Sequence, residues 1–380
     1  MIIYIVKEGD TLTRISENFG VSMEQIIWAN QLEYPYHLVI GQSLLLLTEV
    51  IQEYRNLFAN GFAYPFINSW ILEQTLPYLS ELSVFSYGFT TDGNLIPPSL
   101  PVDWMIETAL SYGCTPILTL TPFGPDGTFS NQLIHSMLSN ETAKDTLMEQ
   151  LRQEMQYSGY GGVNVDFEYI LAEDRDLFTE FVRALTIIIE ETGGEVTVDL
   201  APKTSDTQQG LLYEGKDYRA LGDAATRVFV MTYEWGYTYG PPMAVAPIDK
   251  VKQVLDYATS VIPKERITMG IPNYGYDWEL PLVRGETKAQ TIGNIEAVQI
   301  AIANGATIFF DNTAQSPFFH YVVNNVTHEV WFEDARSILA KYRLLQSYPL
   351  FGFGCWQIMR LFRPMWLLSA AELDNVEIVE

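Results

Sequence analysis

The sequence predicts an α/β chain in which a (β/α)8 TIM barrel, with a small α+β insertion between its seventh and eighth strands, follows a small βααβ domain. Strand-like and helical segments alternate over roughly 320 residues, as such a barrel requires. The alternative is a doubly wound open sheet. That fold usually carries a glycine-rich phosphate turn after its first strand, and none follows residues 61–67.

The composition is that of a globular protein with a strongly acidic balance. The chain has 380 residues, of which 48% are hydrophobic, and a formal net charge of -25. This charge argues against binding to nucleic acids and to anionic lipid surfaces, because both need a basic footprint. No apolar run is long enough for a membrane span, and the first residues, MIIYIVKEGDT, do not resemble a secretory signal peptide.

The cysteines and histidines give no sign of a metal site. Cys114 and Cys355 both lie in apolar, strand-like runs, so we expect buried free thiols, although a disulfide stays open. The four histidines are scattered and form no zinc-type spacing with cysteine. We therefore expect neither a metal nor a cofactor.

Residues 1–48 read as a separate strand–helix–helix–strand unit. A β-prone run opens it, and Leu12, Ile15 and Phe19 form the stripe of a first helix, capped by Asp10 or Thr11. Residues 22–30 form a second helix, with Ser22 as N-cap and Gln25 completing a capping box. The run LVIGQSLLLL closes the unit as a strand, and residues 49–59 follow as a linker that is a candidate helix.

The motifs of this unit lie in its turns. They are Gly9-Asp10-Thr11-Leu12, Phe19-Gly20-Val21 and Ile40-Gly41-Gln42. Along its whole length the unit resembles a LysM domain, which implies binding of N-acetylglucosamine-containing glycans such as peptidoglycan and chitin. The groove that the resemblance implies is formed by Gly9, Asp10, Thr11, Leu12, Leu38 and Ile40.

Residues 60–380 carry the predicted barrel. Its eight strand-like segments are residues 61–67, 82–89, 116–122, 161–170, 195–202, 226–235, 267–276 and 350–358. The clearest helix spans residues 172–192, with Gly193 as its C-cap, and Asn140 caps the helix before the fourth strand. Residues 281–337 contain ATIFFD and EVWFED, and we expect them to form the α+β insertion.

The fourth segment, GGVNVDFEYI (161–170), carries the most informative pattern. Side chains alternate along a strand, so Asn164, Asp166 and Glu168 face the barrel interior while the apolar residues between them face the helices. Glu168 is nearest the carboxyl end, where barrel active sites lie, and a neighbouring carboxylate favours its protonated, general-acid form. A buried polar network without catalysis is the alternative. Asp199, on the fifth strand, faces the interior or supports a turn, and the sequence leaves this open.

Four segments together resemble family 18 glycoside hydrolases. The family pattern D-x-x-D-x-D-x-E appears here with Gly161 and Asn164 at the first two acidic positions. MTYEW (231–235) resembles the family's Met-x-Tyr-Asp, with Glu234 in place of Asp, and GIPNYGYDW (270–278) and GFGCWQI resemble its seventh and eighth strands. With the attached LysM unit, the chain looks most like the spore-germination, cortex-lytic N-acetylglucosaminidase branch of Firmicutes.

The resemblance implies retaining, substrate-assisted hydrolysis of β-1,4 bonds at N-acetylglucosamine. Glu168 would be the acid and base, Asp166 would orient the substrate's acetamido group, and Tyr233 would donate to that group. Asn164 would hold Asp166, and Trp356 would form the stacking floor. Further substrate contacts are expected at Met231, Glu234, Asn273 and Tyr274.

The implied partner is peptidoglycan, with that of the spore cortex implied by the resemblance, or another N-acetylglucosamine polymer. The implied location is the spore coat or cortex or the cell wall, reached without a visible signal peptide. The alternatives are a chitinase, a non-catalytic LysM-anchored glycan-binding protein, and a structural spore-coat component.

Overall fold

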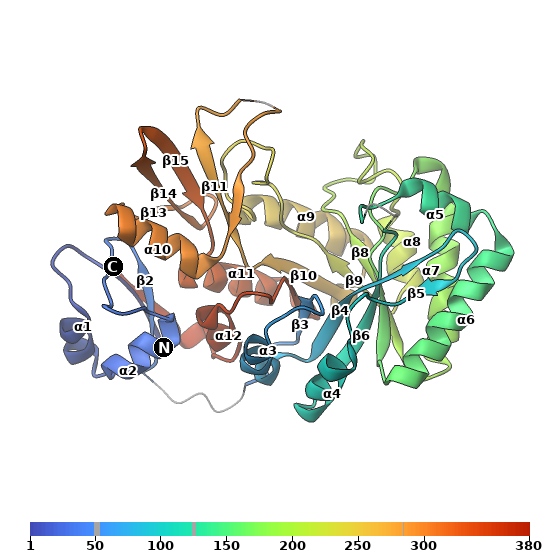
Figure 1. Ribbon diagram of the computed structural model, residues 1–380, viewed down its shortest axis with the longest axis horizontal. Coiled ribbons are helices and arrows are strands. Elements are labelled where there is room, and N and C mark those ends of the chain that lie inside the picture. Colours follow the sequence, from blue (N-terminus) through green and yellow to red (C-terminus); the bar gives the residue numbers. More distant parts are fainter. Residues whose placement is uncertain (49–53, 124–126, 284) are drawn as a thin grey trace.

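The computed structural model describes residues 1–48, 54–123, 127–283 and 285–380. Eight parallel strands form its main sheet, and pairing of the first with the second closes it into a barrel (Figure 1). In spatial order they are β3 (Ala59–Ala63), β4 (Glu81–Phe89), β6 (Thr115–Leu120), β7 (Gly162–Val165), β8 (Glu195–Leu200), β9 (Arg227–Val230), β10 (Ile267–Pro272) and β16 (Gly352–Trp356). The predicted barrel and all eight of its strand segments are confirmed. A short strand, β5 (Leu95–Ile96), pairs antiparallel with the end of β4.

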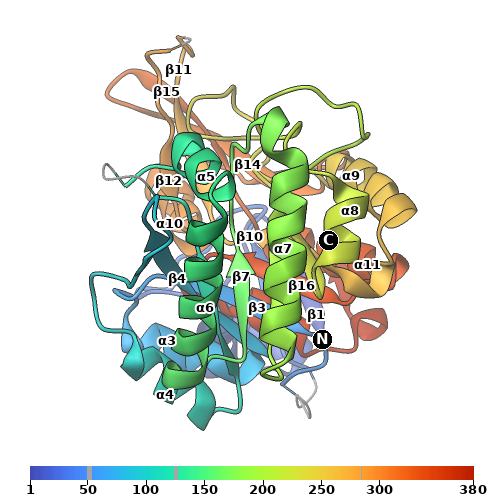
Figure 2. The same cartoon turned by 90° about the vertical axis from the view of Figure 1, so that its right-hand side faces the viewer.

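Helices cover the outside of the barrel, and α6 and α7 lie side by side over β7 (Figure 2). The helices are α3 (Ser69–Thr75), α4 (Asp103–Ser111), α5 (Asn131–Leu138), α6 (Glu141–Ser158), α7 (Arg175–Glu190), α8 (Tyr218–Ala224), α9 (Ile248–Val261), α11 (Ala335–Ser347) and α12 (Arg363–Ser369). In the part of the chain that the structure describes, none is long and apolar enough to cross a bilayer.

The predicted helix ends are only partly right. Asn140 caps α6 by accepting from the Ala143 amide, as expected. The helix predicted over residues 172–192 starts later, because Ala172–Asp174 form a 3-10 turn, and α7 ends at Glu190. Gly193 is therefore not its C-cap but lies in the following turn, where its φ of 81° is one that glycine adopts readily.

Cys114 and Cys355 are buried and free.

A second, antiparallel sheet rises between β10 and α11. It comprises β11 (Gly275–Leu280), β12 (Gln290–Ile292), β13 (Phe309–Asp311), β14 (Ser316–Val323) and β15 (Val326–Trp331), and α10 (Asn294–Asn304) packs beside it. This α+β unit is the expected insertion, although its first strand starts within the segment assigned to the seventh barrel strand. The domain limits themselves stay a prediction.

The N-terminal unit has the expected order of β1 (Ile2–Ile5), α1 (Leu12–Phe19), α2 (Met23–Asn30) and β2 (Ser43–Leu46). Thr11 caps α1, and Ser22 with Gln25 forms the predicted capping box of α2. A third strand, β17 (Glu377–Val379), comes from the other end of the chain and pairs in parallel with β1. Of the predicted linker, residues 49–53 lie outside the described residues, and residues 54–58 form no helix.

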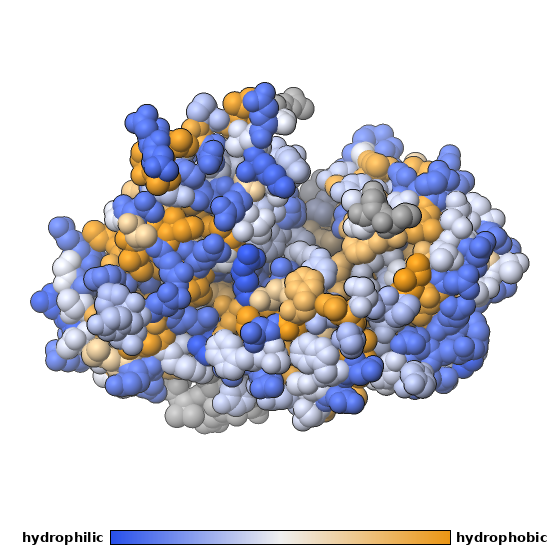
Figure 3. All heavy atoms as spheres, viewed as in Figure 1, coloured by the Kyte–Doolittle hydropathy of each residue, from blue (hydrophilic) through white to orange (hydrophobic). Residues whose placement is uncertain are grey.

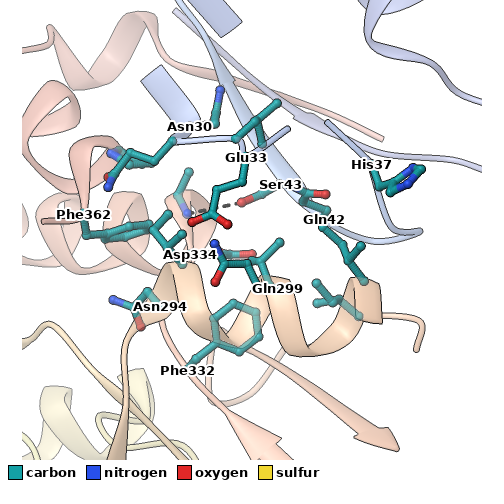
Figure 4. A pocket seen from close by; sticks show the side chains of 18 of the residues that line it. Asn30, Glu33, His37, Gln42, Ser43, Asn294, Gln299, Phe332, Asp334 and Phe362 are labelled. Atoms are coloured by element: carbon teal, nitrogen blue, oxygen red, sulfur yellow. Dashed lines mark hydrogen bonds between the residues drawn. The ribbon is translucent and has the colours of Figure 1, made fainter. Parts of the chain in front are cut away.

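The loop between α2 and β2 sits on the insertion. Val39 is buried in an apolar cluster with residues of α10, β14 and β15. The Ile308 amide donates to the Ile40 carbonyl at 2.9 Å, and Arg336 donates to the Gly41 carbonyl at 3.1 Å. A cavity of about 190 Å³ remains at this junction, where Glu33 extends toward α10 (Figure 4). The N-terminal unit is therefore fixed to the rest of the chain by this loop, by β17 and by hydrogen bonds of Gln31 and Trp28 in and after α2 with the segment at the start of α12.

Gly41 tests this docking. Its φ is 83°, and a Cβ there would lie 1.8 Å from the Ile308 carbonyl oxygen. Gly20 also has a positive φ, 66°, but a Cβ there would meet nothing within 4 Å. We expect Gly20→Ala to lower the free energy of unfolding by about 1 kcal/mol and Gly41→Ala by about 3 kcal/mol or more, measured by thermal unfolding. Equal losses of unfolding free energy in the two variants would show that the docked loop can move away from Ile308 without destabilising the protein.

Candidate active site

A cavity of about 600 Å³ opens at the carboxyl ends of the barrel strands. The space-filling view shows this side of the molecule hollowed between the insertion and the part of the barrel that carries α5 (Figure 3). Nine residues were expected at the catalytic site and its substrate contacts, and six of them line this cavity. Asp166, Glu168, Met231, Tyr233, Glu234 and Trp356 line the cavity.

Alternation along β7 and the residues after it positions the two acids as expected. Asp166 and Glu168 line the cavity, and Asp166 is only 5% exposed. Between them Phe167 points the other way and stacks on Phe178 and Phe181 of α7, with ring centroids 5.6 and 6.0 Å apart. Packing of the apolar face against α7 therefore fixes the polar face toward the cavity.

Asn164 does not hold Asp166, contrary to expectation. Its amide donates to the Asp199 carboxylate at 2.6 Å and to the Thr197 hydroxyl at 2.9 Å. The reason is strand register, because Asn164 lies opposite Thr197 in the β7–β8 ladder. Asp199 thus faces the barrel interior. One carboxylate oxygen of Asp166 has no hydrogen-bond partner among the described residues.

A steric restriction explains why glycine occupies position 161, where the family pattern has an acid. A Cβ at this position would lie 2.3 Å from Cγ2 of Thr115 on the neighbouring strand β6. The first acid of the family pattern therefore has no room here unless the Thr115 side chain moves.

Burial dominates the electrostatics of the acids. It raises the pKa of Asp166 well above its usual range, and the Asp199 and Glu168 charges raise it further. Burial likewise raises the pKa of Glu168 and, to about 7, that of Asp199. The hydrogen bond from Asn164 and the charge of Lys216 oppose the rise at Asp199. The raised pKa favours the protonated form of Glu168, which a general acid requires.

Sequence reasoning missed Lys216. It lies in the loop before α8, carries no recognisable motif, and is 1% exposed. Its ammonium donates to the backbone carbonyl of Asp199 at 2.6 Å. Only the folded loop brings this cation to the acids.

Tyr233 and Glu234 follow β9 and approach the acids from a third strand. Burial raises the pKa of Tyr233 well above its usual value, and the nearby carboxylates add to this, so Tyr233 stays a neutral phenol and a donor. Glu234 accepts from the hydroxyls of Tyr274 and Tyr276, which lower its pKa against the larger effect of burial.

Two expected substrate contacts lie outside the cavity lining. Tyr274 donates to Glu234 instead. The Asn273 side chain donates to the carbonyls of Gln357 and Arg360 at 3.1 and 2.8 Å, and so braces the loop after β16. Both residues support the lining from behind.

Aromatic rings form much of the cavity wall. Trp356 packs edge-on against Phe85, with ring centroids 4.9 Å apart, and contacts Phe62 and Tyr64. The aromatic lining residues that the sequence did not single out are Phe62, Tyr64, Phe85, Phe123, Phe129, Tyr169, Tyr213, Phe229 and Tyr237. They come from separate strands and loops, so no spacing in the sequence joins them.

Two lining residues have unusual backbone conformations. Tyr169, directly after Glu168, has a φ of 57°, and Glu234, directly after Tyr233, has a φ of 69°. Such conformations are costly for residues with a side chain, and they concentrate at functional sites.

The expected glycan-binding residues of the N-terminal unit lie in two loops. Asp10 accepts from the Tyr4 hydroxyl and the Lys7 amide, so its carboxylate shapes the turn at Gly9. Thr11 caps α1 and Leu12 is buried. Leu38 is half-buried, whereas Ile40 is 42% exposed. Ile40 is the member of this set with a free apolar surface.

Comparison with known proteins gives consistent matches. The model of the glycosyl hydrolases family 18 matches residues 124–360, and that of the LysM domain matches residues 4–46. The chain is 37% identical to the cortical fragment-lytic enzyme of Bacillus subtilis (strain 168), over 99% of each chain. It is similar to the crystal structure of the spore cortex-lytic enzyme SleL of Bacillus megaterium QM B1551, with a TM-score of 0.91 and 31% identity over 100% of this chain and 98% of that one. For the Bacillus cereus SleL structure the TM-score is 0.80, with 33% identity over 99% and 87%.

Asn164→Asp tests the bond to Asp199. Two carboxylates at this contact cannot both ionise, so the pKa of the pair rises above its unfolded value. The folded variant then binds an extra proton, and its stability falls as pH rises through that raised pKa. We expect a deficit of about 2–4 kcal/mol at neutral pH that shrinks toward about pH 5, measured by thermal unfolding.

Asn164→Ala is the control, because it loses the same hydrogen bonds without adding a charge. Its deficit should change less with pH than that of Asn164→Asp. An Asn164→Asp variant as stable as the unmodified protein at about pH 8 would contradict this account of the site.

Proposed function

This chain belongs to family 18 of the glycosyl hydrolases and carries a LysM domain, and from that premise we propose that it cleaves β-1,4 bonds at N-acetylglucosamine in spore-cortex peptidoglycan, with retention of configuration. The observation that carries the proposal is the placement of Asp166, Glu168 and Tyr233 in one aromatic-walled cavity at the strand ends. It is a glycosidase by family, and the substrate and the residue roles are our proposal.

The two acids take different roles in the proposed reaction. Glu168 protonates the glycosidic oxygen while the substrate's own N-acetyl oxygen attacks the anomeric carbon, so no protein nucleophile is needed. The bond to the leaving sugar breaks, and a cyclic oxazolinium forms on the substrate. Glu168, now ionised, then takes a proton from the water that opens this ring.

Asp166 and Tyr233 position the acetamido group. Asp166 lines the cavity, so its carboxylate accepts from the acetamido N–H and stabilises the positive charge that develops on the oxazolinium. The Tyr233 hydroxyl, kept neutral by burial, donates to the acetamido oxygen and aims it at the anomeric carbon. Asn164 acts through Asp199 instead of Asp166.

The aromatic wall suits a sugar chain. Trp356 is half-buried with one side toward the cavity, which fits a stacking floor under a pyranose ring. The names of the relatives, cortical fragment-lytic and spore cortex-lytic enzyme, support cortex peptidoglycan as the substrate. They also support association with the spore cortex or coat, where the LysM domain would hold the enzyme on its polymer.

Replacing Glu168 tests the reaction. Glu168→Gln keeps the shape of the side chain but cannot give up and regain a proton, so we expect cleavage of cortex peptidoglycan to fall by about 10³-fold or more. The measurement is release of new reducing ends, with mass spectrometry of the products. Glu173→Gln is the control, because its side chain is 71% exposed, close by in the sequence and outside the cavity.

Each outcome of this test decides something. An unmodified protein that releases no reducing ends would favour a glycan-binding or coat protein. Faster cleavage of chitin oligomers than of cortex would favour a chitinase. Equal products from the unmodified protein and the Glu168→Gln variant would remove Glu168 from the mechanism.

Replacing Ile40 tests the LysM surface. We expect Ile40→Ser to weaken co-sedimentation with insoluble peptidoglycan by about tenfold, because an exposed apolar contact is lost, while cleavage of soluble fragments stays unchanged. Leu110→Ser is the matched control, since Leu110 is 52% exposed on α4, away from the LysM domain. Equal binding by both variants would argue against Ile40 as a contact.

A further inference from the structure

Lys216 is a buried cation at the centre of an acidic site. It is 1% exposed, and its ammonium donates at 2.6 Å to the backbone carbonyl of Asp199. No carboxylate lies within ion-pair distance of it among the described residues. Burying an ammonium without a direct partner is costly, so its retention here calls for a compensating interaction.

The loop of Lys216 packs tightly against the segment that follows β7 and carries the acids. A Cβ at Gly215 would lie 2.3 Å from the carbonyl oxygen of Ile170, two residues after Glu168. The next residue, Lys216, then bonds to the end of β8. Backbone contact on one side and a hydrogen bond on the other thus fix the ammonium between the ends of β7 and β8.

The charge of Lys216 acts on all three acids, the buried Asp166 and Asp199 and the half-buried Glu168. Burial lowers its pKa, while Glu168, Asp166 and Asp199 raise it. In return, Lys216 lowers the pKa of each of the three. The other titratable groups that face these acids are Tyr64, Tyr169, Tyr233 and Glu234. None of them carries a positive charge, so Lys216 is the cation of this cluster among the described residues.

We propose that Lys216 is a positioning residue of the hydrolytic site, which fixes the end of β8 through Asp199 and balances the negative charge of Asp166, Glu168 and Asp199. This inference rests on the proposed function. Asp166 must be anionic when the oxazolinium forms, and Asn164 cannot share a proton or a charge with it. The Lys216 ammonium stabilises that anion, because its positive charge opposes the effect of burial on Asp166, while Glu168 retains its proton.

The test removes the charge in two ways. Lys216→Gln keeps a donor for the Asp199 carbonyl and Lys216→Met does not, so together they separate the charge from the hydrogen bond. Lys216→Arg keeps the charge. Lys203→Met is the matched control: Lys203 is equally buried and donates to the Lys216 carbonyl at 3.0 Å, but its charged neighbours are Asp206, Arg175 and Asp217.

The first readout is the pH profile of kcat/KM on soluble cortex fragments. Without the cation the three carboxyls hold their protons to higher pH. Both limbs of the profile, Asp ionisation on the acid side and Glu168 deprotonation on the alkaline side, should therefore rise by about one unit in Lys216→Gln and Lys216→Met. Lys216→Arg should restore them, and Lys203→Met should leave them in place. Unmoved limbs in both charge-removing variants would overturn the inference.

The second readout needs no activity. The acids have folded-state pKa values above their unfolded ones, so they cost stability as pH rises, and more so without Lys216. The melting temperature of Lys216→Gln should fall further below that of the unmodified protein at about pH 8 than at about pH 5, with a constant gap for Lys203→Met. A constant gap for Lys216→Gln would contradict the inference. If the unmodified protein cleaves no cortex fragments but the melting-temperature gap of Lys216→Gln widens with pH as expected, only the proposed hydrolysis is contradicted.

Discussion

The site depends on one constraint, the burial of the Asp166 and Asp199 carboxylates beside the half-buried Glu168 at the ends of two adjacent strands. Asp166 and Glu168 extend from β7, and Asp199 faces them from β8. Three neighbouring groups make this burial tolerable. Asn164 donates to Asp199, Lys216 supplies positive charge, and the phenol of Tyr233 adds no further negative charge because it stays neutral. The same burial that makes the acids costly raises their pKa values and so keeps a proton available for transfer. Burial of the acids therefore lowers the stability of the fold and at the same time favours the protonated carboxyl that the reaction needs.

The constraint is maintained by apolar packing at some distance from the chemistry. Phe167 stacks on two rings of α7, which leaves the alternate side chains of the strand no orientation other than toward the cavity. Behind the opposite wall, the Tyr274 hydroxyl and the Asn273 amide hold Glu234 and the loop after β16. These residues do not themselves line the cavity, yet they fix the positions of groups that do. Substitutions there should therefore alter the site without removing any group from it.

The parts of the molecule that local pattern determines were predictable. Strand-like apolar runs located all eight barrel strands, the capping residues Ser22 and Asn140 were identified from their neighbours in the sequence, and Thr11 was one of two candidate caps for α1. The polar face of β7 followed from a period of two. What failed depends on which strands are neighbours: the partner of Asn164 is set by register with β8, and Lys216 enters through a loop whose path no periodicity describes. The aromatic wall could not be predicted from the sequence either, because its residues come from many separate segments that only the folded barrel brings together.

The pairing of β17 with β1 joins the two ends of the chain in one sheet (Figure 1). This pairing has a consequence for biosynthesis. The LysM domain is synthesised before the barrel, whereas β17, the strand that completes its sheet, is synthesised after the barrel. Until then the β1 edge is open to pairing with other chains, and the contact spans nearly the greatest sequence separation that the chain allows. Loss of β17 would therefore expose the β1 edge of the LysM domain, so that damage to the segment after the barrel opens a strand edge in the domain before it.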